Sequence, residues 1–406
     1  MIVLALSSGT SVDAVDVAAA DLDLDADGTL HLRLLGHGEH PWPDHLRARV
    51  HAAMPPAAVG AGEVTALDTL VGRHLGAVAR RADAELTGGR SAVVASHGQT
   101  LFHWVDADGT ARGSLQVGHP AWIAEATGRP VVADFRVADI AAGGQGAPLV
   151  AVLDALWLAE AGRTSIALNI GGIANATVVR GPGEPVLAWD TGPGNCLLDA
   201  AVRDLTGGAL GYDRDGALAA AGTVDEAALA ALLADPYYAR PVPRSSGREH
   251  FDAGYVRRVL AGVRPGIAGP DLAATLVELT ARTVADDLRP HRPDRVVVSG
   301  GGAHHPVLLR RLGELLPGVT TSDALGLPVD GKEAYLFALL GFLAVAGLPG
   351  TAPGPDGRRA TGATRAAVLG SLTPPAPHPL APGDVRAAAV RRLVLHHPDR
   401  PEGGLR

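Results

Sequence analysis

Apolar positions fall along this chain in two patterns, and together they predict an α/β fold. Short continuous apolar runs, as at 2–7, 91–95 and 295–298, are typical of buried strands. Apolar residues three or four positions apart, as in 61–86 and 272–288, are typical of helices with one buried face. Several of the apolar runs end in glycine and small polar residues, which indicates tight turns at strand ends.

The order of the predicted elements occurs twice. The first half is expected to hold strands at 2–7, 15–22, 30–35, 91–95 and 130–133. The second half is expected to hold strands at 165–169, 176–179, 186–189, 295–298 and 319–321. In each half, three strands with a glycine turn after the first are followed by a helix, a strand ending in Ser-x-Gly, a helix and a strand. Two such halves would face each other across a cleft, where ligands tend to bind.

The glycine turn at 190–195 carries the first candidate chemistry. An apolar strand at 186–189 runs into Asp190, then into Thr-Gly-Pro-Gly-Asn, and then into a helical pattern. Backbone N–H groups at the start of a helix suit an anion such as phosphate. Asp190 could act there as a general base. An ordinary strand-to-helix loop would show the same pattern, so this turn alone leaves both interpretations open.

Two further turns have a similar composition. The segment Ser8-Gly9-Thr10-Ser11 would let a phosphate approach the backbone, and Asp13 beside it could hold a hydrated magnesium ion. A plain hairpin turn is the alternative. The glycines at 300–302, after Ser299, permit close contact with a flat ring or a sugar, although a helix entry would look alike. The combination of the three turns in duplicated halves is more specific than any one of them.

Composition narrows the class of protein. The 406 residues are 47% hydrophobic, enough for large buried cores, and the net charge of −8 argues against a general nucleic-acid-binding surface. A single cysteine, Cys196, excludes an intramolecular disulfide. No apolar run approaches the ~20 residues of a membrane-spanning helix. We therefore expect a cytoplasmic protein with no membrane or nucleic-acid partner, whose Pro- and His-rich segment 373–406 is a flexible tail.

Familiar catalytic motifs are absent from the chain. It contains no GxxxxGK[ST], HExxH, CxxC or GxSxG, which excludes P-loop, zinc-protease, CxxC redox and nucleophile-elbow hydrolase sites. Its one lysine, Lys332, lacks the P-loop context. Glycine turns at strand ends, with carboxylates beside them, are the remaining candidates.

Eight longer segments carry a resemblance to a known family. They are GTSVDAVD at 9–16, SHGQT at 96–100, DFRVADIAAGGQGAPLV at 134–150, NIGGIAN at 169–175, DTGPGN at 190–195, SGREHF at 246–251, SGGG at 299–302 and TGATRAAVLG at 361–370. In this order, and across residues 2–372, they resemble the motif series of the anhydro-N-acetylmuramic acid kinases. The chain departs from that family at Ala14, where Gly is usual, and at His304-His305, where an Asn commonly follows SGGG.

The resemblance implies a fold and a reaction. The fold would be a two-domain actin/hexokinase-like ATPase with ribonuclease H-like halves and an interdomain active-site cleft. Domain I would comprise 1–134 and 350–372, and domain II would comprise 135–349. The reaction would use ATP and Mg²⁺ to open 1,6-anhydro-N-acetylmuramic acid by hydrolysis and to phosphorylate O6. It would give N-acetylmuramic acid 6-phosphate and ADP in cell-wall (peptidoglycan) recycling, and the enzyme would be a homodimer.

The resemblance also implies roles for single residues. Asp190 matches the catalytic base, and Glu333 is a second active-site candidate. The cofactor-binding residues would be Ser8, Gly9, Thr10, Ser11, Asp13, Gly171, Gly172, Gly192, Gly194, Asn195, Gly300, Gly301 and Gly302, with Asp13 also the metal ligand. The substrate-binding residues would be His97, Gln99, Asp134, Arg136, Gln145 and Asn175. The candidates for binding the lactyl carboxylate of the sugar are Arg136, Arg244 and Arg248.

Two alternatives stay open. A related anhydrohexose kinase of the levoglucosan type would share the motifs and differ in the sugar it phosphorylates. A non-catalytic actin-like nucleotide-binding protein would bind ATP without releasing ADP in response to a sugar. Asp190 and the sugar-kinase motif series argue against the second alternative.

Overall fold

The computed structural model describes residues 1–375 except 10–11, 107, 243, 245–249 and 253. The predicted ligands Thr10 and Ser11, the candidate Arg248 and most of the predicted tail therefore lie outside the described residues.

The first sheet has six strands, in the order β13-β7-β4-β1-β2-β3. The strands are β1 (Ile2–Ser7), β2 (Ala14–Leu24), β3 (Leu30–Pro41), β4 (Val93–Ser96), β7 (Val131–Ala133) and β13 (Ser371–Thr373). Strands β1, β2 and β3 form an antiparallel meander, whereas β4 and β7 run parallel to β1. Strand β13 brings the end of the described chain back to the edge of this sheet, antiparallel to β7.

The second sheet repeats that topology, with the order β10-β9-β8-β11-β12. Its strands are β8 (Ser165–Ile170), β9 (Ile173–Val179), β10 (Leu187–Pro193), β11 (Arg295–Ser299) and β12 (Val319–Thr321). Again the first three strands are antiparallel and the last two run parallel to the first. This shared arrangement is that of ribonuclease H-like halves, so the predicted two-part α/β fold is confirmed.

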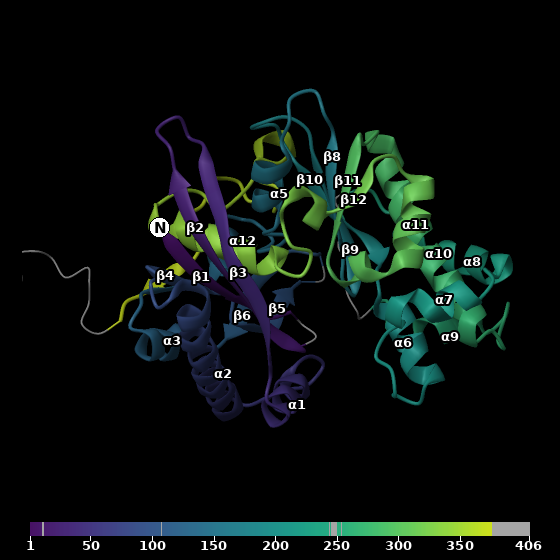
Figure 1. Ribbon diagram of the computed structural model, residues 1–406. Helices are drawn as coiled ribbons and strands as arrows, with labels where there is room; N and C mark the ends of the chain where they lie inside the picture. Colours follow the sequence, from purple (N-terminus) through teal and green to yellow (C-terminus); the bar gives the residue numbers. More distant parts are fainter. Residues whose placement is uncertain (10–11, 107, 243, 245–249, 253, 376–406) are drawn as a thin grey trace, which may run out of the picture.

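The helices cover the two sheets (Figure 1). In the first half they are α1 (Asp44–Ala53), α2 (Ala61–Ala82), α3 (Pro120–Thr127), α4 (Phe135–Ala141) and α5 (Ala151–Leu158). In the second half they are α6 (Cys196–Leu205), α7 (Ala217–Ala221), α8 (Glu226–Leu233), α9 (Tyr255–Leu260), α10 (Gly269–Leu288), α11 (Pro306–Leu315) and α12 (Lys332–Val345). A hairpin of β5 (Gln99–Val105) and β6 (Ala111–Val117), which the sequence analysis did not predict, follows β4.

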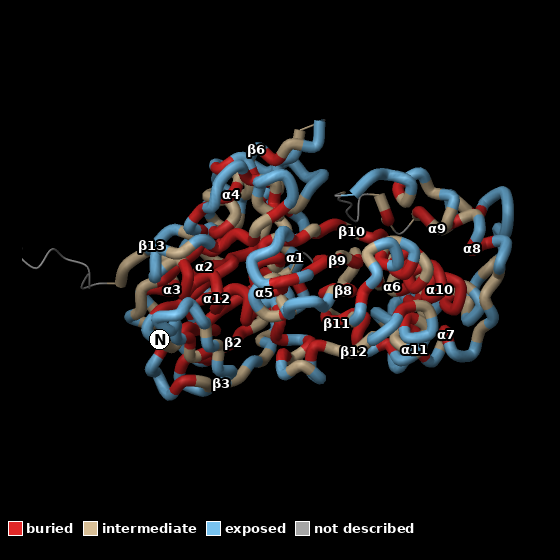
Figure 2. The backbone as a smooth tube through the Cα atoms, turned by 90° about the horizontal axis from the view of Figure 1, so that it is seen from above, coloured by how far each residue is buried: buried red, intermediate tan, exposed pale blue. Residues whose placement is uncertain are grey.

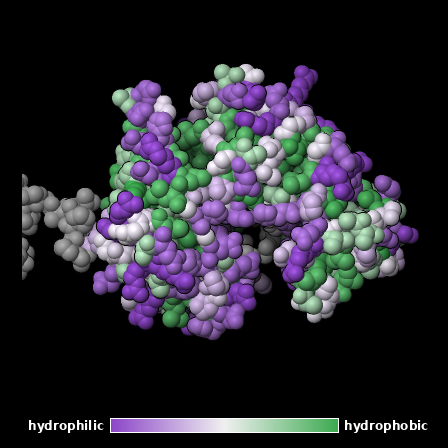
Figure 3. Space-filling model, viewed as in Figure 1, coloured by the Kyte–Doolittle hydropathy of each residue, from purple (hydrophilic) through white to green (hydrophobic). Residues whose placement is uncertain are grey.

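We call the half built on the first sheet the first lobe and the half built on the second sheet the second lobe. Two helices join the lobes. Helix α12 packs against β1, β2 and β4 of the first sheet, and α5 packs against β8 and β9 of the second. Both helices contribute to one hydrophobic core that draws residues from both sheets, and the buried stretches run through the middle of the molecule in Figure 2. The molecule is hollowed between the lobes (Figure 3). The domain bounds stay a prediction. Helix α12, which lies within the range expected for domain II, packs on the first sheet.

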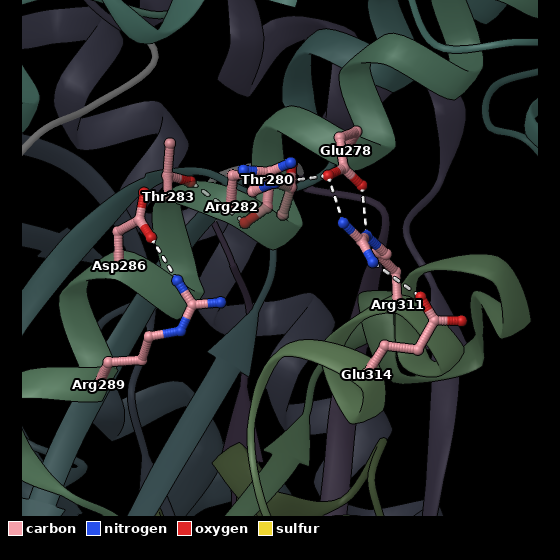
Figure 4. A network of polar contacts seen from close by, with 8 residues as sticks. All are labelled: Glu278, Thr280, Arg282, Thr283, Asp286, Arg289, Arg311 and Glu314. Carbon is pink, nitrogen blue, oxygen red and sulfur yellow. Dashed lines mark hydrogen bonds and ion pairs between the residues drawn. The ribbon is translucent and has the colours of Figure 1, made fainter.

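A charged network fixes the outer helices of the second lobe (Figure 4). The buried carboxylate of Glu278, on α10, accepts hydrogen bonds from Arg282 Nε at 2.7 Å and from Arg311 Nε and Nη2 at 2.7 and 2.9 Å. Arg311 also donates to Glu314, at 2.8 Å. Helix α11 is thereby tied to α10 by a bidentate contact, the strongest geometry available to an arginine and a carboxylate.

In the described part of the chain, no single helix has the length and apolar composition needed to cross a bilayer. One pair of helices, at 214–221 and 226–233, reaches that length and composition when its two members are taken together, although the pair is bent by 115° at the break between them.

Candidate active site

Two rows of polar side chains occupy equivalent positions in the two sheets. In the first sheet, Ser7 on β1 pairs with Asp16 on β2, and Asp16 pairs with Glu39 on β3. In the second sheet, Asn169 on β8 pairs with Asn175 on β9, and Asn175 pairs with Asp190 on β10. Directly opposite residues on paired strands project from the same face of a sheet. Each row therefore presents its polar groups together at the same level of its sheet.

A cavity of about 430 Å³ opens between the lobes and brings these rows together. From the first sheet and the elements on it, the lining includes Asp16, Glu39, Arg136, Lys332 and Glu333. From the second lobe, it includes Asn169, Gly171, Asn175, Gly300 and Gly301. The predicted site residues Arg136, Asn175, Gly171, Gly300, Gly301 and Glu333 thus meet in one cavity.

Asp190 is half-buried and is not part of the cavity lining, but on β10 it lies directly opposite Asn175 of β9, which does line the cavity. The pairing of β10 with β9 shifts register between Asp190 and Gly192, so the strand bulges just after the carboxylate. The backbone of Asp190 is held on both sides, because its N–H donates to Arg244 O at 2.9 Å and its carbonyl accepts from Tyr237 Oη at 2.7 Å. The position of Asp190 is therefore rigidly set.

The backbone of the turn after Asp190 is engaged within the protein. The N–H groups of Gly194, Asn195 and Cys196 donate to the carbonyls of the Gly171-Gly172 turn, at 2.9, 2.8 and 3.1 Å. These three amides are therefore not open to a phosphate in this structure, and the expectation that Gly192, Gly194 and Asn195 bind the cofactor stays a prediction. A Cβ on Gly194 would lie 2.3 Å from Gly171 O, so glycine is needed here for close packing of two turns.

The neighbouring glycines are explained by similar contacts. Gly192 has φ +144°, and a Cβ on it would lie 2.9 Å from the Tyr238 ring. On the third turn, a Cβ on Gly300 would lie 2.6 Å from Asn169 Oδ1, and one on Gly302 would lie 2.3 Å from the Ile170 side chain. Gly301, between them, faces the cavity.

A second pocket, of about 370 Å³, adjoins the cavity at Gly301. Its lining includes Asn195, Tyr212, Asp213, Arg214, Asp215, His304 and His305. His305 Nε2 lies 3.3 Å from Asp213 Oδ2, whereas His304 Nε2 lies 2.8 Å from Asp330 Oδ1. The two adjacent histidines therefore have different partners, and both line this pocket.

Buried side chains stabilise the first glycine turn, which follows β1. The buried hydroxyl of Ser8 donates to Ala14 O at 3.1 Å and accepts from Trp42 Nε1 at 3.1 Å. Gln99 is fully buried, and its Nε2 donates to Gly9 O at 3.2 Å. Both side chains hold the shape of the turn. Ala14 is the first residue of β2, so its methyl group is compatible with the backbone there.

The predicted metal ligand and the cavity carboxylates are different residues. Asp13 is exposed and is not part of the cavity lining, whereas Asp16 is. Burial raises the pKa of Asp16 to about 7, and the carboxylates of Glu333 and Glu39 act in the same direction. Glu333 is exposed to the cavity, yet the surrounding protein desolvates its carboxylate and raises its pKa, against the opposing effect of the Arg136 cation. The described residues contain no group of three or more His, Cys, Asp or Glu side chains that could hold a metal ion.

Asp16 and Glu39 are residues that the motif-based assignment of roles missed. Asp16 stands inside a quoted motif, and Glu39 stands in a polar stretch of a strand. The register of the β2–β3 hairpin, which pairs them, is the feature that identifies them.

The remaining predicted substrate residues are not part of the cavity lining. His97 is buried and contacts Arg136, and Gln145 is exposed, with its Oε1 accepting from Ala111 N at 2.9 Å. Asp134 lines a separate pocket of about 240 Å³, together with Ser96, His97 and Gln116. It has φ 60°, an uncommon conformation for a residue other than glycine. Asp134 is therefore not brought to the cavity that Asn175 and Glu333 line.

Comparisons with known proteins agree with the motif series. The family model described as anhydro-N-acetylmuramic acid kinase matches residues 1–375. A protein of that description from Streptomyces coelicolor is 55% identical over 376 residues, covering 92% of this chain and 94% of the relative. One from Rhodococcus erythropolis is 49% identical over 383 residues, with 92% and 94% covered.

Among solved structures, similarity is weaker. A ROK hexokinase from Thermus thermophilus is 21% identical with a TM-score of 0.30, and covers 83% of this chain and 99% of its own. A ROK family glucokinase from Streptomyces griseus, in complex with glucose and AMPPNP, is 15% identical with a TM-score of 0.31, covering 83% and 99%. Scores this low carry no argument, so the fold assignment rests on the strand topology described above.

Proposed function

Since the chain belongs to the anhydro-N-acetylmuramic acid kinase family, we propose that it opens 1,6-anhydro-N-acetylmuramic acid by hydrolysis and phosphorylates O6 with ATP. The products are N-acetylmuramic acid 6-phosphate and ADP, and the reaction belongs to peptidoglycan recycling. The observation that carries the proposal is the half-buried Asp190, which pairs with Asn175 of β9, a residue in the lining of the cavity between the lobes.

Asp190 is the general base in this proposal. Water attacks the anomeric carbon of the sugar, Asp190 takes the proton from that water, and the bond from the anomeric carbon to the bridging O6 breaks. The electron pair of that bond stays on O6, which attacks the γ-phosphorus of ATP and releases ADP. Because O6 passes its charge directly to a phosphoryl group, no separate acid is required to protonate it. The fixed backbone of Asp190 suits a base that must stand at one side of the ring.

ATP would extend across Gly301. The pocket with Tyr212, His304 and His305 has room for a nucleoside, and it meets the larger cavity at Gly301, which has no side chain to block the passage. The phosphates would then reach the Gly9 and Gly171 turns. Backbone approach of this kind is why glycine is common at phosphate sites.

Magnesium fits the acidic side of the cavity. Mg²⁺ is usually held by one or two carboxylates together with substrate phosphates and water, so a three-residue cage is not needed. Asp13 remains the candidate from the family motif, and the cavity-lining Asp16 is a second. When bound, the ion would neutralise charge on the transferred phosphoryl group.

The carboxylate of the sugar would bind Arg136. This arginine lines the cavity, where Glu333 is its acidic neighbour. Arg244 is engaged elsewhere, since its Nη2 lies 2.5 Å from Asp287 Oδ2 and its Nη1 donates to Arg240 O at 2.9 Å. Arg248 lies outside the described residues.

The test of the proposed function is turnover by an Asp190→Asn variant. ADP release that depends on the anhydro sugar should fall by about 10²–10⁴-fold, the usual contribution of a general base, while ATP binding is retained. Unchanged turnover would remove Asp190 from the role of base. Levoglucosan serves as the comparison sugar, because a preference for it over the muramic substrate would favour a different anhydrohexose kinase.

Location and assembly belong to the same proposal. A cytoplasmic location fits the supply of ATP and the lone Cys196. We also propose a homodimer, and light scattering coupled to gel filtration tests it, with a monomeric mass as the contrary result.

A further inference from the structure

The guanidinium of Arg136 is held on two sides before any ligand binds. Its Nη1 donates to Gly146 O at 2.8 Å. On the other side, Nη2 and Nε lie 3.0 and 3.3 Å from His97 Nε2. Each Nη carries two N–H groups, so these contacts leave donors on both Nη atoms for a planar acceptor such as a carboxylate.

His97 is itself rigid. Its side chain is buried, with 4% exposure, and its ring lies 4.7 Å from the Phe337 ring, which lies 5.4 Å from the Phe135 ring. Its backbone N–H donates to Leu6 O at 2.9 Å, which fixes the end of β4 to β1. Burial, and then the Arg136 cation, lower the pKa of His97 to about 3. The imidazole is therefore uncharged near neutral pH, and the lone pair of Nε2 is available to accept from Arg136.

The carbonyl of Gly146 is fixed by a buried carboxylate. Asp139 is fully buried, and its Oδ2 accepts from Gly146 N at 2.8 Å. Its Oδ1 accepts from Thr361 Oγ1 at 2.6 Å. The loop that contacts Arg136 is thereby tied to the returning C-terminal segment, so both partners of the guanidinium are set by the fold.

We infer that His97 is a positioning residue, which accepts hydrogen bonds from Arg136 and so orients the guanidinium toward the carboxylate of the sugar. The inference rests on the proposed function, because it takes a sugar that carries a carboxylate as the ligand. It revises the prediction that His97 binds substrate directly, since its Nε2 is occupied by Arg136. Without His97, Arg136 would keep its charge and lose its orientation.

The test compares two sugars in variants of one residue. His97→Phe keeps a ring against Phe337 and removes the acceptor, whereas His97→Gln keeps an acceptor. The ligands are 1,6-anhydro-N-acetylmuramic acid and the same anhydro sugar without the lactyl ether. Calorimetric binding without ATP and steady-state KM are measured for both sugars.

In His97→Phe, affinity for the muramic sugar should fall about 10–100-fold, as expected for hydrogen bonds to a charged group. Affinity for the sugar without a carboxylate should change less than threefold, and kcat for the muramic sugar should change less than its KM. His97→Gln should recover part of the loss. His74→Phe is the control, because His74 on α2 is also partly buried and its ring lies 4.8 Å from the Trp42 ring; it should leave the ratio of the two affinities unchanged.

An equal loss for both sugars in His97→Phe would show a merely structural role and overturn the inference. Unchanged affinity for the muramic sugar would overturn it as well. If the wild-type protein binds the muramic sugar without phosphorylating it, the proposed function fails while the binding comparison still decides the role of His97. No binding of that sugar to the wild type would overturn both.

Discussion

Replacement of Lys332 by methionine removes the positive partner of a buried ion pair. Lys332 Nζ lies 2.7 Å from Asp154 Oδ1, and the two residues are 5% and 1% exposed. The pair joins the first residue of α12, on the first sheet, to α5, on the second. The substitution therefore leaves a carboxylate alone in the core where the two lobes meet.

The expected cost follows from that burial. Breaking a buried pair by removing one partner typically costs about 3–5 kcal/mol of unfolding free energy, because an uncompensated charge remains. Methionine keeps the stem of the lysine, whose Nζ lies 6.0 Å from the Trp157 ring, so little packing should be lost. The double variant Lys332→Met/Asp154→Leu should recover most of the stability, since an apolar pair in place of an ion pair is often neutral.

Urea unfolding followed by tryptophan fluorescence measures these effects. Arg49→Gln is the matched control, because Arg49 and Glu63 form a bidentate pair with side chains 40% and 34% exposed. Breaking such a surface pair should cost about 0–1 kcal/mol. The reasoning is refuted if Lys332→Met costs no more than the control, or if the double variant loses the sum of the two single losses.

Three further substitutions test other contacts. The pKa of Asp16 is about 7 in the folded protein, against 3.8 for an ordinary aspartate. The folded state therefore loses stability as the pH rises from 3.8 to about 7. In Asp16→Asn, the unfolding free energy measured with urea should differ less between pH 5 and pH 8 than in the wild type. An unchanged difference would contradict the raised pKa of Asp16. Gly194→Ala should lower the melting temperature and abolish turnover, because the new methyl would lie 2.3 Å from Gly171 O, whereas Gly313→Ala, with nothing within 4 Å, should do neither. Glu278→Gln should cost about 1.5–3 kcal/mol of unfolding free energy by weakening its charged hydrogen bonds, and a loss under ~0.5 kcal/mol would argue against the network.

Most strands and helices could be predicted because their apolar patterns are local. The helix expected at 272–288 begins at Gly269, three residues early, and that expected at 61–86 begins at Ala61 and is α-helical as far as Ala82. The β5–β6 hairpin was missed because it has no clear buried face: Phe102 and Trp104 are 48% and 53% exposed. Periodicity indicates an element only where burial imposes it.

The candidate site was predicted in part. The motif series identified Arg136, Asn175 and Glu333, which line one cavity. It also assigned Asp134, which lies in a different pocket. Motifs record which residues recur together, and the path of the chain decides whether they meet.

The turn after Asp190 shows why the other contacts of the site could not be predicted from the sequence. Its composition is that of an anion site, yet its amides donate to carbonyls some twenty residues earlier in the chain, at Gly171 and Gly172. Nothing in the local sequence states which acceptor a backbone N–H will meet. Hydrogen-bond partners across a fold are set by strand order and packing.

By itself, the sequence determined the elements, their duplicated order and the family, because each depends on neighbouring residues or on continuous motifs. Only the tertiary structure decided that α12 crosses to the first sheet, that Asp16 pairs with Glu39 as Asn175 pairs with Asp190, and that His97 and Gly146 hold Arg136 between them. These features depend on register and on contacts between distant segments. Pairing register is fixed by the burial of whole faces and by the turns between strands, so it exists only once the sheets have formed.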